Sequence, residues 1–203
     1  MTPANDFQAL VAQRIRDCST LMETLLRDTV FQQTVREAGA ALIRVLRDGH
    51  KVLFFGNGGS AADAQHLAAE LAGRFQFDRP ALAGLALTAN TSCLTAIGND
   101  YAFDQIFSRQ VESLGVPGDA AFGITTSGRS SNVLRAFETA RSRGMITVSM
   151  TGKTGEALRN STDFCLCVPS KDTPRIQEAH ILTGHILCEI IERGMFGEPS
   201  GIS

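Results

Sequence analysis

The first side chains that could do chemistry are an imidazole and a carboxylate, His66 and Glu70, which follow a glycine-rich turn on a predicted helix. Their four-residue spacing places both on one face of the helix, about 6 Å apart along its axis. Such a pair can move protons or bind a metal ion. It therefore indicates either acid–base chemistry or a metal site.

The turn before this helix suits an anion. The apolar run of residues 52–55 leads into the turn of residues 56–60, Gly-Asn-Gly-Gly-Ser, and the helix follows directly. Glycines let backbone N–H groups approach a ligand, and a helix N-terminus carries about half a positive charge. The turn is no Walker A loop, because no Gly-Lys-Ser/Thr follows, and Ala61 replaces the third glycine of the dinucleotide fingerprint. The turn still favours a polar, phosphorylated ligand, although such turns can also serve only to reverse the chain.

A second loop, rich in hydroxyl groups, follows another predicted strand at residues 119–125, and a helix is predicted to continue from Val133. From Thr125 to Ser130 the chain offers four hydroxyl groups, and Ser130 or Ser131 can cap the helix. Hydroxyls and free amides suit phosphate oxygens. A loop of this kind can also be an ordinary helix cap. Two of them in one α/β domain favour a binding site, because ligands gather outside the carboxyl ends of the strands.

The order of the predicted elements determines where these loops lie. Five short apolar runs alternate with helical patterns, which favours an α/β fold with a doubly wound, five-stranded parallel sheet and helices on both faces. The apolar run at residues 145–150 is typical of a central strand. The predicted strands are residues 51–55, 82–88, 119–125, 145–151 and 163–168, and the helices between them include 61–74, 131–143 and a short segment at 154–160.

Both ends of the chain show long helical periodicity. Residues 6–48 and 175–195 repeat apolar side chains at helical spacing, and in the second stretch these cover much of the helix circumference. A helix of this kind needs cover beyond its own sheet. We therefore expect long N- and C-terminal helices that pack between subunits of a homo-oligomer.

Composition excludes several classes of function. A chain of 203 residues can form one domain with a substantial core, and a net charge of −2 gives no electrostatic footprint for nucleic acid. No apolar run is long enough to span a bilayer and the first residues are too polar for a signal peptide, so we expect a cytoplasmic protein without nucleic-acid or membrane partners. Five cysteines without a C-x-x-C pair fit that compartment. Cys165 and Cys167 share one face of a predicted strand and are interpreted as core residues.

With these residues in hand, the chain resembles the sugar isomerase (SIS) domain family, and within it the phosphoheptose isomerases, from about residue 45 to residue 191. The resemblance implies a single domain over residues 1–203 with a flavodoxin-like fold. Residues 49–195 would be the sugar-phosphate-binding core, and the helices of residues 1–48 would pack in a homotetramer. The segments that carry the resemblance are residues 56–71, 95–100, 118–119, 125–128 and 175–178, together with His185.

The implied reaction converts sedoheptulose 7-phosphate to D-glycero-D-manno-heptose 7-phosphate, which feeds the heptoses of lipopolysaccharide or another surface glycan. Such an aldose–ketose isomerisation moves a proton between C1 and C2 through an enediolate, so it needs a base, an acid and positive character near the oxyanion. We assign Glu70 as the base and His185 as the acid. The sugar-phosphate contacts that the resemblance implies are Asn57, Gly58, Gly59, Ser60, Glu70, Asn99, Asp100, Thr125, Thr126, Ser127, Ser130 and Gln177.

The resemblance also implies one zinc ion per subunit, bound by His66, Glu70, Gln177 and His185. Gln177 and His185 are two turns apart, about 12 Å along their helix, so one ion can touch both only if Gln177 leans forward and His185 backward. Zinc would act as a Lewis acid and as a template for the substrate. If Glu70 and His185 stay bound to zinc they are poorer proton carriers, and a catalytic or a structural zinc is compatible with the pattern.

Some positions depart from the family pattern. Arg129 stands where the family commonly has asparagine and adds a cation beside the phosphate site. Pro174 replaces an acidic residue that some members have, which removes an auxiliary group for proton transfer. His180 has no role in the pattern and is interpreted as a core histidine.

Two alternative functions share the fold. One is a non-catalytic relative that binds a replication initiator protein, and the other is a sugar-phosphate-sensing or amino-sugar isomerase module. Non-catalytic relatives typically lack the acid of the first core helix, whereas Glu70 is present here. The compact single-domain length and the pattern of zinc ligands argue against the second alternative.

Overall fold

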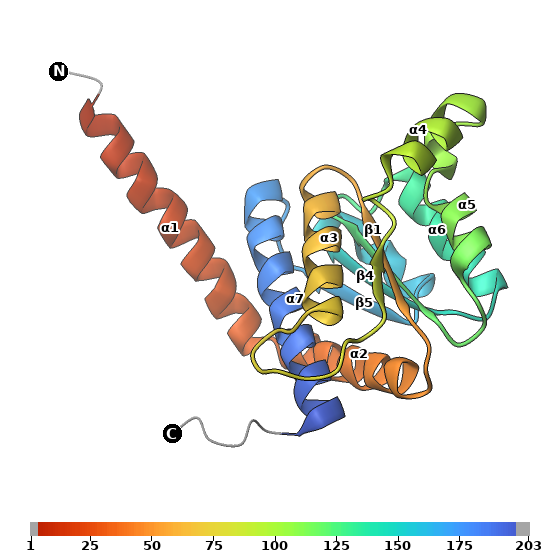
Figure 1. Cartoon of the computed structure of the whole chain (residues 1–203). Coiled ribbons are helices and arrows are strands. Elements are labelled where there is room, and N and C mark those ends of the chain that lie inside the picture. Colours follow the sequence, from red (N-terminus) through yellow and green to blue (C-terminus); the bar gives the residue numbers. More distant parts are fainter. Residues whose placement is uncertain (1–3, 198–203) are drawn as a thin grey trace.

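A five-stranded, wholly parallel sheet forms the centre of the computed structural model, which describes residues 4–197 (Figure 1). The strand order is β2-β1-β3-β4-β5, so the chain winds outward from β1 in both directions. This order confirms the predicted doubly wound α/β fold. The strands are β1 (Val52–Gly56), β2 (Gly84–Ala86), β3 (Ala120–Thr125), β4 (Ile146–Gly152) and β5 (Phe164–Val168).

Helices cover both faces of the sheet. One face packs against α2, α3 and α7, and the other packs against α5 and α6. Neighbouring residues of β1 divide between the two cores, Phe54 in the first and Phe55 in the second, which explains why β1 is apolar throughout. The helices are α1 (Ala4–Arg27), α2 (Thr29–Arg47), α3 (Gly59–Ala72), α4 (Thr91–Asp100), α5 (Ser108–Leu114), α6 (Ser131–Ser142) and α7 (Thr173–Phe196), with 3-10 segments η1 (Phe103–Gln105) and η2 (Lys153–Asn160).

Some elements differ from the predictions. The strand predicted at residues 82–88 is only three residues long, since β2 lies at the sheet edge and pairs with β1 alone. The segment predicted at residues 154–160 is a 3-10 helix. The short helices α4 and α5 were not among the predicted helices: α4 buries none of its residues and α5 has only seven, so neither carries strong helical periodicity.

The N-terminal helical pattern divides into two helices at Asp28. The Asp28 carboxylate accepts a hydrogen bond from the Phe31 N–H at 2.9 Å and caps α2. Helix α2 packs against the sheet, whereas most of α1 extends away from the body (Figure 1). The apolar side chains of Phe7, Val11 and Ile15 on α1 are all more than half exposed. No helix within residues 4–197 is both long enough and apolar enough to cross a membrane.

The residues interpreted as core are buried. Cys165 and Cys167 lie in the core on β5, and burial raises the pKa of Cys167 to about 11. His180 on α7 is completely buried, and neither of its ring nitrogens has a hydrogen-bond partner of ordinary geometry. Burial lowers the pKa of His180 to about 4, and the Thr151 backbone opposes this shift without cancelling it. The imidazole is therefore neutral in the folded protein at neutral pH.

The fold should lose stability in acid through His180. Its pKa is about 4 in the folded chain, against 6.5 as the ordinary value, so the unfolded chain binds more protons between these limits. The free energy of unfolding should fall by roughly 3 kcal/mol through His180 as the pH drops across this window. Urea unfolding at about pH 7 and about pH 4.5 measures the loss, which should be smaller in His180→Leu. An equal loss in both proteins would contradict the assignment.

Candidate active site

The glycine turn joins β1 to α3 at the carboxyl edge of the sheet. Gly58 precedes α3 with a φ of 57°, in the left-handed region that favours glycine, and no side chain caps the helix. The first N–H groups and the positive end of α3 are therefore free of a competing side-chain cap. This is what an anion site at a helix N-terminus requires.

A pair of side-chain amides ties this turn to the second loop. Asn57 Nδ2 donates to Asn132 Oδ1, and Asn132 Nδ2 donates to Asn57 Oδ1, both at 2.9 Å. Asn132 is buried in the first turn of α6 and has no role in the sequence predictions. The amide of Asn57, which was predicted to contact substrate, is thus engaged in holding the two loops together.

The hydroxyl-rich loop is ordered by its own side chains. Thr125 Oγ1, at the end of β3, lies 3.1 Å from Ser130 Oγ and accepts a hydrogen bond from the Gly128 N–H at 3.2 Å. Gly128 has a φ of 66° and lies so close to Gly155 that a Cβ would clash. Ser130 is the N-cap residue of α6, but its hydroxyl contacts Thr125 rather than capping the helix. The other two hydroxyl side chains are half-buried Thr126 and exposed Ser127.

Helices α3 and α7 lie side by side and run in the same direction (Figure 1). Gly59 lies against Gln177 near the start of both helices, and Leu67 lies against Gly184 further along. A Cβ on Gly184 would be 2.6 Å from Leu67 Cδ2, so the missing side chain permits the close approach. Gly184 is absent from the residues predicted from the sequence, although a glycine inside an apolar helix is the usual signal of such a contact.

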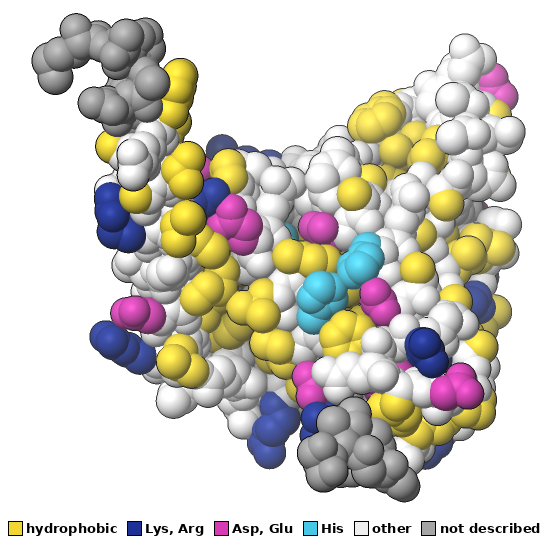
Figure 2. Space-filling model, turned by 60° about the vertical axis from the view of Figure 1, so that its left-hand side comes forward, with side chains coloured by type: hydrophobic (Ala, Val, Ile, Leu, Met, Phe, Trp, Pro, Cys, Tyr) yellow, Lys and Arg dark blue, Asp and Glu magenta, His cyan; other side chains and the backbone are white. Residues whose placement is uncertain are grey.

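The close approach brings His66, Glu70 and His185 together. The two histidine Nε2 atoms are 2.9 Å apart, and Glu70 Oε1 lies 3.4 Å from His66 Nε2. One imidazole must present a proton and the other a lone pair for this contact to hold. The side chain of His66 is 45% exposed, so a ligand can reach the cluster. Figure 2 shows histidine side chains exposed near the middle of one face of the molecule.

Gln177, the fourth predicted metal ligand, lies apart from the other three. Its amide contacts Gly59, seven residues before His66 and so about 10 Å away along α3. Within residues 4–197, no group of three or more His, Cys, Asp or Glu side chains is arranged to hold a metal ion as it stands. The structure thus brings three of the four predicted ligands together and places Gln177 at the glycine turn.

The donor set nevertheless suits a divalent cation. Ligand atoms of a tetrahedral zinc ion are roughly 3.3 Å from one another, close to the two separations around His66. Asp63, one turn earlier on α3, has a buried Oδ2 without a hydrogen-bond partner. Burial raises the pKa of Asp63, and the nearby imidazoles of His66 and His185 offset this only in part. An unpartnered buried carboxylate oxygen beside two imidazoles fits a site for a cation.

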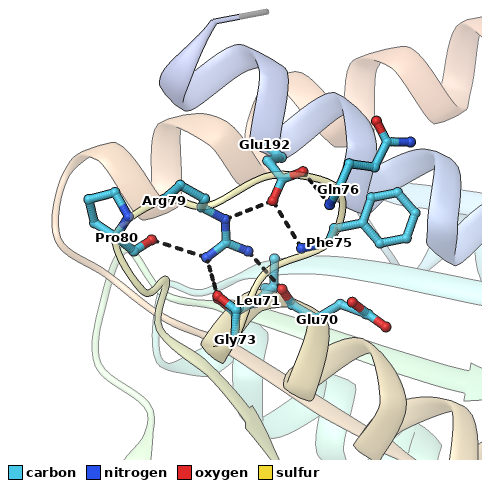
Figure 3. Close-up of polar contacts among 8 residues, drawn as sticks. All are labelled: Glu70, Leu71, Gly73, Phe75, Gln76, Arg79, Pro80 and Glu192. Atoms are coloured by element: carbon cyan, nitrogen blue, oxygen red, sulfur yellow. Dashed lines mark hydrogen bonds and ion pairs between the residues drawn. The ribbon is translucent and has the colours of Figure 1, made fainter. Parts of the chain in front are cut away.

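A buried ion pair lies at the end of α3, where it contacts the Glu70 carbonyl (Figure 3). Arg79 Nε is 3.0 Å from Glu192 Oε1, and the two side chains are only 2% and 1% exposed. Burial alone would raise the pKa of Glu192, but hydrogen bonds from the Phe75 and Gln76 N–H groups and from Arg79 outweigh it and leave the pKa lowered. Neither member of the pair has a role in the sequence predictions.

Two predicted substrate residues lie elsewhere. Asn99 and Asp100 end α4, are exposed, and are joined by a hydrogen bond of 2.8 Å from Asn99 Nδ2 to Asp100 Oδ1. Helix α4 packs chiefly on η1, at the far side of the body from α1 (Figure 1). In the part of the chain that the structure describes, no hydrogen bond joins either residue to the two loops.

The two departures from the family pattern have simple structural settings. Arg129 is exposed, and its N–H donates to Ser127 Oγ at 3.2 Å. Pro174 lies in the first turn of α7, where its fixed φ and missing N–H are tolerated. Pro174 therefore helps to begin the helix that carries Gln177 and His185.

Comparisons with known proteins identify the family. Residues 16–152, more than half of the chain, match the model of the SIS domain. The chain is 46% identical over 192 residues to the phosphoheptose isomerase of Aneurinibacillus thermoaerophilus, covering 95% of this chain and 96% of that protein. The chain belongs to the phosphoheptose isomerases. It is therefore an isomerase, as the resemblance implied.

Two further members of the family support this assignment. The phosphoheptose isomerase of Trichlorobacter lovleyi is 48% identical over 194 residues, covering 96% of this chain and 98% of that protein. The solved structure of the phosphoheptose isomerase from Neisseria gonorrhoeae superposes with a TM-score of 0.85 at 41% identity, covering 92% of this chain and 98% of that one. The parallel sheet with N-terminal helices and a long C-terminal helix is thus the fold of this family.

A methyl group at Gly184 should separate α3 from α7 and lower isomerase turnover. Alanine favours a helix over glycine by about 1 kcal/mol, so a loss would come from the clash with Leu67 and not from a weaker helix. We expect turnover of Gly184→Ala to fall about tenfold in a steady-state assay. The matched control is Gly194→Ala, whose Cβ would meet Ile43 of α2 instead. Equal turnover of the two variants would contradict this role of Gly184.

Proposed function

We propose that the chain interconverts sedoheptulose 7-phosphate and D-glycero-D-manno-heptose 7-phosphate, an early step towards the heptoses of lipopolysaccharide or another surface glycan. The observation that carries the proposal is the contact of His66 with both Glu70 and His185, on the helix that the glycine turn begins, in a chain of the phosphoheptose isomerase family. The same contact disfavours a non-catalytic binding protein, since the acid that such relatives lack is present and faces an imidazole.

The phosphate of the sugar is proposed to bind where the two loops meet. Thr125 and Ser130 offer neighbouring hydroxyls, and α3 begins without a side-chain cap. These groups supply hydrogen bonds and partial positive charge without a buried lysine or arginine. The link between Asn57 and Asn132 keeps both halves of this cradle in a fixed relation before the ligand arrives.

Glu70 is proposed to take the carbon-bound proton and His185 to exchange a proton with the sugar oxygens. A fixed phosphate would hold C1 and C2 at one place along α3, so that the carboxylate meets a single carbon. The carboxylate is only 21% exposed, which limits competition from water. Proton transfer by positioned side chains of this kind contributes about a hundredfold or more to rate.

One zinc ion per subunit is proposed at His66, Glu70, His185 and Gln177. When bound, the ion would polarise the oxygens of the reacting carbons as a Lewis acid. The unpartnered oxygen of Asp63 supports this proposal, because it adds negative charge beside the imidazoles. An amide oxygen is a weak, exchangeable zinc ligand, which is compatible with Gln177 lying apart from the other three.

Glu70→Gln should separate binding from chemistry. The change keeps the size of the side chain but removes its ability to accept a proton, so turnover of sedoheptulose 7-phosphate should fall about a hundredfold or more. The substrate should still raise the melting temperature of the variant, since the phosphate cradle is intact. The control is Glu138→Gln, on the exposed surface of α6, which should keep full turnover. Near-normal turnover of Glu70→Gln would require another base, and a wild-type protein without this activity would overturn the proposed function.

We also propose that the protein is a homotetramer in which α1 packs against other subunits. Besides its own exposed apolar face, α1 borders an apolar cavity of about 320 Å³ between α2 and α7. Hydrophobic side chains run along the α1 arm and onto the body beside it (Figure 2). The cavity is lined mainly by Met22, Leu25, Phe31, Val35, Leu182 and Ile186.

A charge on the exposed face of α1 should dissociate the assembly. Light scattering of the wild type should give four times the chain mass of 21.8 kDa, and Ile15→Glu should lower it, because burying a carboxylate in an apolar contact is costly. Thr20→Glu, on another face of the same helix, should leave the mass unchanged. A monomer mass for the wild type at micromolar concentration would contradict the proposed homotetramer.

A further inference from the structure

The buried pair of Arg79 and Glu192 connects the two helices that carry the proposed catalytic residues. Glu192 follows His185 by seven residues on α7, which places both on the same face two turns apart. Its carboxylate accepts hydrogen bonds from the N–H groups of Phe75 and Gln76 at 3.0 and 2.8 Å, and from Arg79 Nε at 3.0 Å. Figure 3 shows these contacts between α7 and the loop that follows α3.

Arg79 completes the connection at the end of α3. Its Nη2 donates to the Glu70 carbonyl at 2.7 Å, and its Nη1 donates to the carbonyls of Leu71, Gly73 and Pro80 at 2.8, 3.0 and 3.0 Å. The last carbonyls of a helix have no partner within it, and a cation favours this negative end. The rigid fork of the guanidinium therefore fixes the last turn of α3, which is the turn that carries Glu70.

The loop held by Glu192 also reaches His185. The ring of Phe75 packs against the His185 imidazole with their centroids 5.5 Å apart. The Phe75 N–H is itself one of the donors to Glu192. Glu192 thus fixes the backbone from which this ring contacts His185.

We infer that Arg79 and Glu192 are positioning residues, which set Glu70 and His185 at their working separation by locking the end of α3 to α7. This inference rests on the proposed function, in which Glu70 and His185 exchange protons with the sugar. Stability alone is a weak reason for such a pair, because well-packed apolar residues often serve a buried site as well as an ion pair does. Seven hydrogen bonds instead converge on one site from α3, from α7 and from the loop between α3 and β2, and together they fix the position of the end of α3 relative to α7.

The chain contains a matched control for the test. Asp119 is also fully buried, and its carboxylate accepts hydrogen bonds from two backbone N–H groups, those of Lys51 and Val116, and from the Lys51 ammonium. It lies just before β3, at the opposite edge of the sheet from the loops. Asp119→Asn therefore damages a similar ion pair, in which the carboxylate is fully buried and Lys51 is 29% exposed, without touching α3 or α7.

Steady-state kinetics on full-length, zinc-loaded protein should separate Glu192→Gln from Asp119→Asn. We expect kcat of Glu192→Gln to fall about tenfold or more while KM stays within about threefold, since the phosphate cradle is unaffected. Asp119→Asn should keep kcat within about twofold at a temperature where both variants are folded. Arg79→Lys retains the positive charge but loses the planar guanidinium, so it should behave like Glu192→Gln. It takes the place of Glu192→Gln in the test if that variant fails to fold. Equal kcat in the positioning variants and in Asp119→Asn would overturn the inference.

A second readout does not depend on activity. The ring-proton NMR signals of His185 should shift in Glu192→Gln and in Arg79→Lys, because the Phe75 ring moves relative to the imidazole. In Asp119→Asn the shift should fall on His50 instead, whose Nδ1 is 3.5 Å from Asp119 Oδ1. Unchanged His185 signals in folded positioning variants would refute the inference. A wild-type protein that leaves sedoheptulose 7-phosphate unconverted would refute the proposed function alone, and the His185 signals would still decide the positioning role.

Discussion

The parallel packing of α3 against α7 is the contact on which the rest of the site depends. Both helices begin at the carboxyl edge of the sheet, and glycine at positions 59 and 184 removes the side chains that would hold them apart. His66 and His185 meet because these helices run in register. The position of each proposed catalytic group is thus set by the distance between two helix axes, and small residues control that distance.

The proposed phosphate cradle depends on a different constraint, the doubly wound sheet. Strands β1 and β3 are neighbours, so the loops that follow them open at the same edge. The amides of Asn57 and Asn132 then fix these loops to each other. In the proposed mechanism, binding and chemistry therefore depend on separate parts of the molecule: the loops at the sheet edge would bind the phosphate, and the helix pair would act on the reacting carbons.

Much of this could be predicted from sequence because it is local. The His66 and Glu70 spacing, the glycine turn and the apolar strand runs each lie within one segment, and the fold followed from their order. The roles of Gly184, Asn132 and the Arg79–Glu192 pair could not be predicted, since each acts through a partner far away in the chain. The place of Gln177 could not be predicted for the same reason. Helix spacing predicts its distance from His185 along α7, but its contact with Gly59 depends on how α7 packs against α3. Helix α4 was missed because it buries no side chain and so leaves no periodic pattern.

The order of the chain has a consequence for how the site comes into being. His66 and His185 are separated by 119 residues, and α7 is the last helix within residues 4–197. On a ribosome, the sheet and both loops emerge before this helix does, and contacts between distant segments are the slowest to form. Before α7 is made, His185 is absent, so the histidine pair cannot form even though both loops have been synthesised. The proposed catalytic pair is therefore complete only when α7 has packed against α3.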